Sequence, residues 1–382
     1  MRAITKGPKF HWFGYYDKFQ FDPSNRYVLG MEVGFEHRSP RPDDQIRIGM
    51  VDLQDNDRWI DLGSSMAWGW QQGCMLQWVP GRTHEIIWND REDGHFVSHV
   101  LNVKTGKRRT YPMPVYALSP DGKWAITPDF ARLNDTRPGY GYAGIPDPNR
   151  DIKIPKNTGI WRMELESGAV RQIVSLEEAA AVPNINDDVQ GARHWFNHLL
   201  VNTDGTRICF LHRWRDGVGQ KKAFSTRFFT ANPDGSDLYV LDPYGGTSHF
   251  IWRDPNHIMA WATHPSHGEK FYLYTDHSDR VEVVAPDVMT VNGHNTYLPQ
   301  STDWVLNDTY PNREREQNPY LYHIPSGRRI WLGHFRSPKE YSGEWRCDNH
   351  PRSSRDGKRV CIDSAHGGNG RQLYLIDISE IV

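Results

Sequence analysis

Four β-strands can be read from residues 198–243, which run HLLVNTDGTRICFLHRW (198–214), STRFFTANPDG (225–235) and SDLYVLDP (236–243). Apolar and aromatic runs of strand length are interrupted twice by Asp-Gly, at 204–205 and 234–235. Tight type I′ turns need positive φ at both central residues, so Asp-Gly between such runs is a strong hairpin signal. These residues therefore predict four consecutive antiparallel strands.

The same layout recurs along the chain. Turn dipeptides such as Asp121-Gly122, Ser326-Gly327 and Asp356-Gly357 separate runs rich in aromatic and aliphatic residues. Seven segments result, at about 10–63, 72–112, 115–175, 194–243, 247–285, 292–335 and 348–382. Repeats of this length with several short strands each are typical of propellers. The sequence predicts an all-β fold, a seven-bladed β-propeller of four-stranded antiparallel blades.

The two ends of the chain are expected to share one blade. The last segment supplies only three good strands, whereas residues 1–6 precede the first blade without a partner of their own. An N-terminal strand at the outer edge of the last blade would close the ring and leave no long edge exposed. No linker-like stretch divides the chain, so a single domain over residues 1–382 is expected.

Composition excludes several classes of protein. The net charge of −2 and the pI of about 6.8 give no basic footprint for nucleic acid. No stretch approaches the roughly 20 apolar residues of a membrane helix, and the N-terminus lacks a signal-peptide core. We expect a cytoplasmic protein, or a periplasmic one if a signal peptide has been trimmed. The four cysteines lack CxxC spacing and are expected to be reduced, and no feature indicates a protein partner.

Polar side chains gather at two positions of each blade: the start of its first strand, called its opening here, and the end of its second strand, called its closing. In a propeller both positions lie on the same face, around the central channel. The openings carry Tyr15-Tyr16-Asp17, Gln71-Gln72, His194, His198, His249, His294, Asp348 and His350. The closings carry Glu36-His37-Arg38, Asn89-Asp90-Arg91, Asp129, Arg132, residues 212–215, His264, Asn307-Asp308, Asp363 and His366. Any one of them can be explained by hydrogen bonds to a neighbouring blade. Their convergence favours a functional site.

A metal site is expected among the openings of the fifth, sixth and seventh blades. His249, His294, Asp348 and His350 stand at these positions. Imidazole with carboxylate suits Mn²⁺, Zn²⁺, Ni²⁺ or Fe²⁺ better than the all-oxygen cages of Ca²⁺ and Mg²⁺. We therefore expect a divalent metal ion held by these four residues.

Aromatic residues suggest a sugar ligand. The chain has 15 Trp, and those beside polar clusters or in loops, such as Trp68, Trp70 and Trp195, have less reason to be core. An aromatic face beside Arg and Asn can stack on a sugar ring and bind its hydroxyls. A Gly/Pro/Tyr-rich insertion at 134–156 is expected to form a lid or substrate wall, and residues 175–181 a short helix.

Several of these motifs resemble those of oligogalacturonate lyase. The resemblance rests on 198–205 with Phe210-Leu211-His212, on Ser248-His249-Phe250-Ile251-Trp252, on Gly293-His294 and on Asp348-Asn349-His350-Pro351, in the family's order. That family is a seven-bladed propeller. Its catalytic base and metal ligands are histidines of these motifs, so the resemblance implies His212 as catalytic base and His249 and His350 as metal ligands. The chain departs from the pattern at Asp348, where the family has histidine, and at Arg213, where it has glutamate. The glutamine that the family has upstream of its last motif has no clear counterpart near Trp345.

The resemblance implies cleavage of a uronic-acid oligosaccharide by β-elimination. A neutral histidine would remove the proton α to the carboxylate, His212 first and His198 as the second candidate. The metal, with Arg193 and Arg213, would neutralise the developing charge. Substrate contacts are expected from Tyr16, Arg132, Arg215 and Trp195, and Tyr15 or Tyr16 would protonate the leaving oxygen.

Two other classes of function stay open from the residues alone. A glycoside hydrolase would need two carboxylates about 5–10 Å apart, and Asp17, Asp90, Asp129 and Asp308 are available. A non-catalytic binding propeller of the TolB type would need no convergent ionisable pocket. Metal dependence separates the lyase from the hydrolase, and any turnover separates both from the binding protein.

Overall fold

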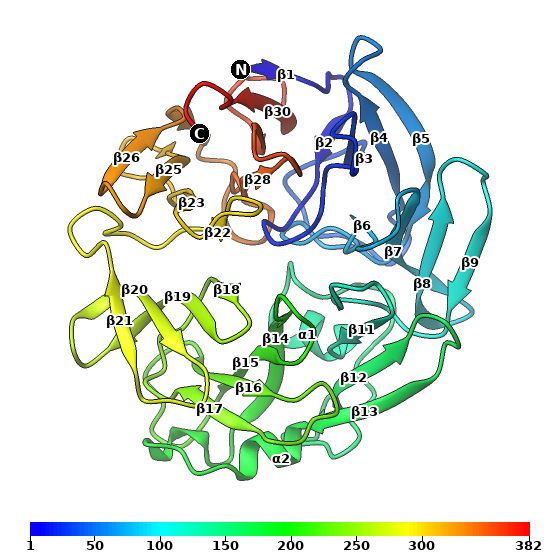
Figure 1. Cartoon of the computed structure of the whole chain (residues 1–382). Helices are drawn as coiled ribbons and strands as arrows, with labels where there is room; N and C mark the ends of the chain where they lie inside the picture. Colours follow the sequence, from blue (N-terminus) through cyan, green and yellow to red (C-terminus); the bar gives the residue numbers. More distant parts are fainter. The chain divides into compact units, whose positions relative to one another are not determined.

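The structure is a computed structural model that describes residues 1–382, apart from the side chain of Asp187. Seven four-stranded antiparallel sheets follow one another along the chain (Figure 1). They are the blades of a seven-bladed β-propeller, which confirms the predicted fold class. Contacts divide the chain into two compact units: unit 1 contains residues 1–114, 142–144 and 292–382, and unit 2 contains 115–141 and 145–291. The expected single domain stays a prediction.

Unit 1 contains blades 1, 2, 6 and 7. Blades 1 and 2 comprise β2 (Phe10–Trp12), β3 (Tyr27–Val33), β4 (Ile46–Asp52), β5 (Arg58–Ser65), β6 (Gln77–Trp78), β7 (Glu85–Glu92), β8 (His95–Asn102) and β9 (Arg108–Tyr111). Blades 6 and 7 comprise β22 (Thr296–Tyr297), β23 (Trp304–Asn307), β25 (Tyr320–His323), β26 (Arg328–Trp331), β28 (Arg352–Ser353), β29 (Arg359–Ser364), β30 (Gln372–Asp377) and β1 (Arg2–Ala3). A small extra sheet of β24 (Glu316–Gln317) and β27 (Phe335–Arg336) and the turn η2 (Gly343–Trp345) complete it.

Unit 2 contains blades 3, 4 and 5. Their strands are β10 (Ala117–Leu118), β11 (Trp124–Thr127), β12 (Gly159–Glu164), β13 (Val170–Ser175), β14 (Arg193–Val201), β15 (Ile208–Arg215), β16 (Ser225–Ala231), β17 (Tyr239–Asp242), β18 (Phe250–Asp254), β19 (His257–His264), β20 (Gly268–Thr275) and β21 (Val281–Val284). The helical elements are α1 (Phe130–Thr136), α2 (Leu176–Ala181) and η1 (Asp187–Val189). The helix expected at 175–181 is confirmed, and its N-terminus carries a capping box formed by Ser175 and Glu178.

The N-terminal strand completes the last blade, as predicted. β1 pairs with β30 through Arg2 opposite Leu375 and Ala3 opposite Tyr374 (Figure 1). The turns of blade 4 also follow the sequence. Gly235 has φ of 88°, and a Cβ added there would lie 1.7 Å from the carbonyl oxygen of Ile173 in blade 3. Glycine is therefore required both by the turn and by this close approach.

The core packs the blades of each unit against one another. In unit 1 one hydrophobic cluster joins residues of blades 1, 2 and 7, and it includes Trp12, Trp68 and Trp70. Trp68 and Trp70 are only 2% and 1% exposed, and their indole N–H groups donate to the carbonyls of Asp44 and Arg38 at 2.9 and 2.7 Å. The expectation that these loop tryptophans meet a sugar is wrong, because large rings fill the wedge between blades.

The insertion at 134–156 is packed rather than open. Its first residues belong to α1, and Tyr140 and Tyr142 are 6% and 0% exposed. Within unit 1 the Tyr142 hydroxyl accepts a hydrogen bond from Asn89 Nδ2 at 2.9 Å. Tyr140 and Tyr142 are therefore core residues, whereas residues 150–153 of the same segment are exposed, and the expected lid stays a prediction.

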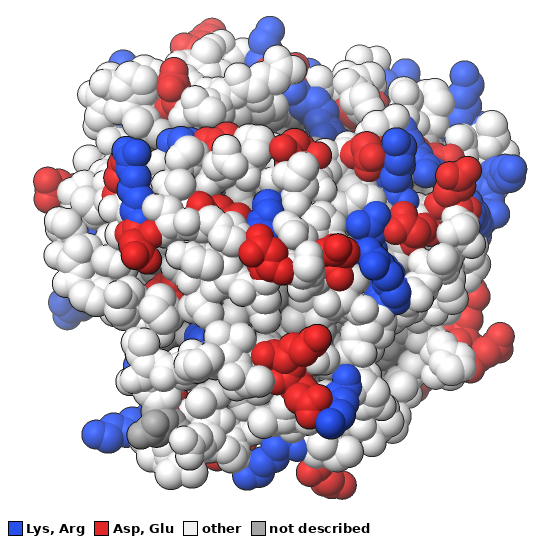
Figure 2. Space-filling view, turned by 60° about the horizontal axis from the view of Figure 1, so that its bottom comes forward, with Lys and Arg blue, Asp and Glu red and all other residues white. Residues whose placement is uncertain are grey.

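The surface carries both signs of charge. On the face shown in Figure 2, Lys and Arg side chains lie among Asp and Glu side chains, and neither sign covers a continuous area of the described residues. None of the helices in the described chain is long and apolar enough to cross a membrane. All four cysteines are buried free thiols.

Candidate functional site: a histidine and carboxylate cluster

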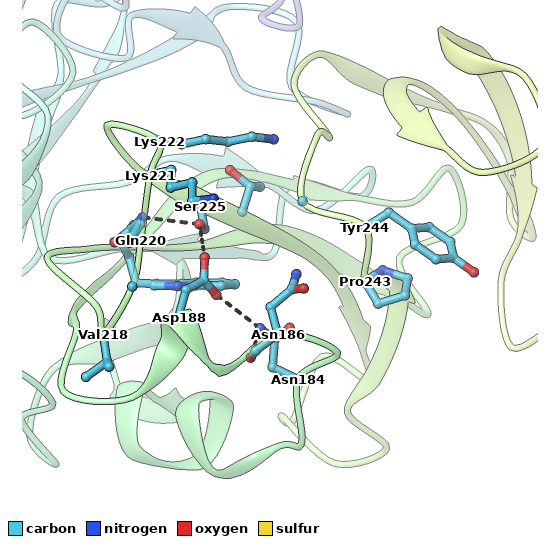
Figure 3. A pocket seen from close by; sticks show the side chains of 14 residues that line it. Asn184, Asn186, Asp188, Val218, Gln220, Lys221, Lys222, Ser225, Pro243 and Tyr244 are labelled. Atoms are coloured by element: carbon cyan, nitrogen blue, oxygen red, sulfur yellow. Dashed lines mark hydrogen bonds between the residues drawn. The ribbon is translucent and has the colours of Figure 1, made fainter.

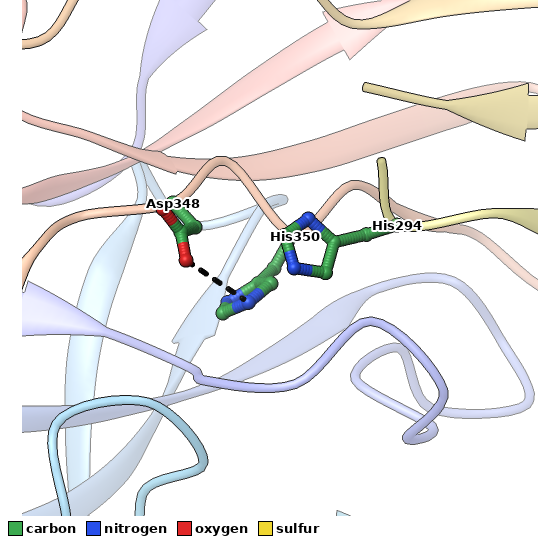
Figure 4. Close-up of side chains that lie close together, drawn as sticks. All are labelled: His294, Asp348 and His350. Atoms are coloured by element: carbon green, nitrogen blue, oxygen red, sulfur yellow. Dashed lines mark ion pairs between the residues drawn. The ribbon is translucent and has the colours of Figure 1, made fainter. Parts of the chain in front are cut away.

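Three of the four predicted metal ligands meet in unit 1. His294, Asp348 and His350 each offer a ligand atom, and these atoms lie within 4.8 Å of one another (Figure 4). The three residues are 1%, 3% and 3% exposed. The rings of His294 and His350 meet edge to face at 4.2 Å between centroids, and His350 Nε2 lies 3.9 Å from Asp348 Oδ2. The cluster is therefore compact and shielded from bulk water.

Asp308 holds the two histidines in place. Its carboxylate accepts the backbone N–H of His294 at 2.7 Å and the backbone N–H of His350 at 3.2 Å. It also lies 2.9 Å from Nδ1 of the His294 ring, so Nε2 is the nitrogen that His294 offers to a ligand. A carboxylate behind an imidazole fixes the orientation and raises the basicity of a metal-binding histidine. Asp308 is thus a positioning residue for the cluster.

The backbone around the cluster is closely fitted. His294 precedes β22 and His350 precedes β28, so both open the first strand of a blade, as the sequence predicted. A Cβ on Gly293 would lie 1.9 Å from the carbonyl oxygen of Asp308. His350 itself has φ of +40°, a conformation that L residues rarely adopt and that is often found at functional sites.

The donor set fits a divalent metal ion. Asp348 Oδ2 accepts from Arg346 Nε at 2.7 Å, while the buried Oδ1 accepts no hydrogen bond from the described residues. A buried carboxylate oxygen without a donor is costly unless something else compensates it. Two imidazoles and a carboxylate are common ligands of Mn²⁺, Fe²⁺, Zn²⁺ and Ni²⁺. His294, Asp348 and His350 are therefore the residues that would hold such an ion.

Two tyrosines of blade 1 border the cluster. The ring of Tyr15 lies 5.2 Å from that of His350, and the ring of Tyr16 lies 5.4 Å from that of His294. Both follow β2 in the sequence and are only 4% and 2% exposed. The predicted substrate contact Tyr16 thus lies beside the metal-ligand candidates.

The fourth predicted ligand, His249, belongs to unit 2. It precedes β18, is 5% exposed, and its Nδ1 lies 3.4 Å from Ser248 Oγ. It is not part of the three-residue cluster. Its role as a ligand stays a prediction.

The predicted base His212 lies in a chain of hydrogen-bonded side chains inside blade 4. An N–H of Arg227 lies 3.3 Å from His212 Nδ1, His212 Nε2 lies 2.8 Å from His194 Nδ1, and His194 Nε2 lies 3.3 Å from the carbonyl of Val189. The only consistent assignment has each group donating to the next, so both rings are neutral. His212 is 0% exposed, and both of its nitrogens are used within the protein. This arrangement leaves no lone pair of His212 for a substrate proton.

Burial and neighbouring cations keep both histidines uncharged. Burial lowers the pKa of His194 to about 4, and Arg227 and Arg132 oppose its protonation further. Burial, followed by His194 and Arg227, holds the pKa of His212 well below its usual value. Burial also lowers the pKa of Arg227, to about 10, so this guanidinium is still charged at neutral pH.

The histidine pair predicts a loss of stability in acid. The folded pKa values lie below the unfolded value of about 6.5, so below that pH the unfolded chain binds protons that the folded chain does not. For His194 the free energy of unfolding should fall by about 1.4 kcal/mol per pH unit between roughly pH 6.5 and 4, and His212, whose pKa is also lowered, should add a fall of the same sign. Urea titrations across this range should show a shallower fall in His212→Gln than in the wild type. His267→Gln, at an exposed turn, should follow the wild type, and equal slopes in all three proteins would contradict the prediction.

The predicted arginines of unit 2 are engaged within the protein. Arg193 pairs with Asp135, Arg215 donates to the carbonyl of Thr136, and Arg213 Nε donates to Thr226 Oγ1 at 3.3 Å. Trp195 is 1% exposed, with the Arg215 guanidinium 5.2 Å from its ring centroid. Their roles toward a substrate stay predictions.

Arg132 is a structural residue. Its guanidinium is 1% exposed and donates to Asp147 Oδ2 at 3.0 Å and to the carbonyls of His194, Asn149 and Lys153 at 2.9, 2.9 and 2.8 Å. Four of its five N–H groups are thus engaged within the protein, and its role as a substrate contact stays a prediction. The sequence could not show this, because three of the partners come from residues 147–153, which form no helix or strand, and the fourth comes from β14.

His198, the second base candidate, lies at an irregular point of β14. The pairing of β14 with β15 shifts register between Asn197 and Leu199, and His198 has φ of +46°. Its ring is 1% exposed and stacks on Phe250 at 4.1 Å. Bulges often re-aim a side chain next to an active site, which keeps His198 as a candidate.

The carboxylates required by a hydrolase all have structural partners. Asp17 pairs with Lys18 at 3.0 Å, and Asp129 caps the N-terminus of α1. Asp90 accepts the backbone N–H of Met66 at 2.7 Å, and Asp308 orients the cluster histidines. These contacts give no support to a free pair of catalytic carboxylates.

Comparisons with known proteins agree with the architecture. No protein-family model matches the chain, and no curated protein sequence does. An oligogalacturonate lyase described in complex with manganese superposes with a TM-score of 0.68 at 12% identity, covering 98% of this chain and 92% of the other. The fold is that of the oligogalacturonate lyases. The oligogalacturonate lyase of Vibrio parahaemolyticus gives 0.67 at 12% identity, with coverage of 98% and 92%. The propeller domain of the trilobed protease of Pyrococcus furiosus gives 0.55 at 11% identity and covers 96% of both chains.

Proposed function

We propose that this protein is a carbohydrate lyase that cleaves a uronic-acid-containing oligosaccharide by metal-assisted β-elimination. The observation that carries the proposal is the buried cluster of His294, Asp348 and His350, backed by Asp308, in a fold shared with oligogalacturonate lyases. One of those neighbours is described with manganese, which makes Mn²⁺ the first metal to test here.

The proposed reaction needs charge neutralisation, a base and an acid. A divalent ion in the cluster would supply a Lewis acid for the substrate carboxylate, which makes the adjacent C–H more acidic. The base takes that proton, the C–H electron pair forms a double bond, and the glycosidic C–O bond breaks. Tyr16, which lies beside His294, is our candidate to protonate the leaving oxygen.

Mutation of two histidines distinguishes between the candidates for the catalytic base. His198 and His212 belong to unit 2, and both stay sequence-based candidates. Since both nitrogens of His212 have protein partners, His198→Gln should remove turnover, whereas His212→Gln should mainly lower stability. The reverse result would restore His212 as the base.

The function is tested by elemental analysis combined with an absorbance assay. The purified protein should contain stoichiometric divalent metal. It should raise the ultraviolet absorbance of oligogalacturonate solutions, because elimination creates a conjugated unsaturated uronate. A chelator should stop the reaction, and Mn²⁺ should restore it.

Each other outcome points to a different class of protein. New reducing ends without an absorbance change, insensitive to chelator, would indicate hydrolysis. Absence of metal and of turnover on uronates and neutral glycans would contradict the lyase and favour a binding propeller.

A further inference from the structure

Unit 2 contains a cavity of about 380 Å³ that the metal cluster does not share (Figure 3). It lies where β15 ends and β16 begins, between the loop of residues 216–224 and the segment that contains η1. Its volume is near the lower end of the range for small-molecule sites. One wall is Trp214, whose ring also contacts those of His212 and His194.

The cavity has two cationic groups without a carboxylate partner in the described chain. Lys221 and Lys222 line it and are exposed, and no ion pair joins either to a described residue. Among the described residues of the lining the only carboxylate is that of Asp188, which accepts from Ser225 Oγ at 2.5 Å and from Asn184 Nδ2 at 3.4 Å. The described lining residues therefore carry more positive than negative charge.

The rest of the lining suits a sugar. Asn184, Asn186 and Thr226 supply amide and hydroxyl groups, and Figure 3 shows the two asparagines across the cavity from the lysines. Tyr244 lies at the rim with 40% of its surface exposed, and Val218 is 68% exposed. An exposed aromatic ring offers a face to the C–H surface of a sugar, while amides bind its hydroxyls.

The loop that carries the lysines is anchored. Gly217 N–H donates to Gln220 Oε1 at 3.0 Å, and Gln220 Nε2 donates to the carbonyl of Trp214 and to Ser225 Oγ, both at 3.1 Å. A Cβ on Gly217 would lie 1.5 Å from the carbonyl oxygen of Asp188, so the loop lies directly on that segment. The site is therefore built into blade 4 rather than being two lysines on a free surface.

We propose that this cavity binds a carboxylate-bearing sugar unit, with Lys221 and Lys222 on its carboxylate and the asparagine amides on its hydroxyls. The inference rests on the proposed function for the identity of the sugar. It does not require the metal, because none of the cluster residues lines the cavity.

The test is binding of trigalacturonate by isothermal titration calorimetry in the presence of chelator, which stops turnover. Lys221→Glu/Lys222→Glu should weaken binding by at least about tenfold, since two attractions become repulsions. Tyr244→Ala should weaken it less. Lys104→Glu/Lys107→Glu, an equal charge change at the exposed β8–β9 turn, should bind as the wild type does.

The outcomes separate this inference from the lyase. Lysine-dependent binding without turnover would support the cavity and contradict the lyase. If the protein turns over substrate and Lys221→Glu/Lys222→Glu leaves binding unchanged, the lyase is supported and the proposed sugar site in the cavity is overturned. Equal affinity for neutral galactotriose, or no binding by the wild type, would also overturn it.

Discussion

Replacing His350 by alanine is expected to remove stoichiometric metal and to lower lyase turnover by about a thousandfold or more. His350 is one of only three ligand candidates in the cluster, and its loss leaves Asp348 and His294. A Lewis acid that neutralises a developing charge contributes several kcal/mol to a transition state, and each 1.4 kcal/mol is about tenfold in rate. Elemental analysis and the absorbance assay measure the two effects separately.

Two further variants make this result specific. Asp308→Asn keeps the size of the side chain but loses the charge behind His294, so metal affinity should fall by roughly 10–100-fold. His323→Gln removes a histidine of unit 1 whose ring bonds only Ser326 among the hydrogen bonds observed, and it should retain both metal and activity. Full metal content in His350→Ala would show that the ion lies elsewhere, and metal loss without a change in rate would remove the metal from the mechanism.

Metal identity is a separate measurement from metal occupancy. Two histidines and a carboxylate also hold iron in many enzymes. Under the proposed function, activity lost on chelation should be restored better by Mn²⁺ than by Fe²⁺ or Zn²⁺.

The fold could be predicted because its determinants are local. Asp204-Gly205 and Asp234-Gly235 mark the turns of blade 4, where Gly205 and Gly235 have φ of 79° and 88°, although the preceding aspartates do not have the positive φ of a type I′ turn. Strand pairing in a blade is between sequence neighbours, so the order of strands follows from the order of turns. The additional sheet of β24 and β27 was missed, because each strand has only two residues and they are distant in sequence.

The site could be predicted only in part, because the end of a strand is known but the direction of a side chain is not. The predicted blade openings placed His294, Asp348 and His350 in one site, and in the structure these three residues lie together. Asp308 stood at a predicted strand closing, yet nothing in the sequence showed that its carboxylate would turn toward His294. Periodicity also could not separate charged groups at the site from Arg132, which is buried as a structural cation.

Replacing Arg132 by methionine is expected to lower the free energy of unfolding by about 3–5 kcal/mol, the typical cost of removing one partner of a buried ion pair. Asp147 has a fully buried side chain and would lose its nearer cationic partner, Arg132 Nη1 at 3.0 Å, keeping only Arg193 Nη2 at 3.8 Å. Three carbonyl groups would also lose a donor. Urea unfolding followed by tryptophan fluorescence measures the change.

The matched control is Arg150→Met in the same segment. Its side chain is 68% exposed and lies 3.6 Å from Asp135, so the free energy of unfolding should change by no more than about 1 kcal/mol. Arg132→Met/Asp147→Leu should recover part of the loss, because an unpaired buried carboxylate is then absent. If Arg132→Met is as stable as the wild type but binds oligogalacturonate more weakly, Arg132 is a substrate contact after all. Stability loss with partial rescue by Asp147→Leu would instead establish that this cation holds the segment of residues 147–153 against β14.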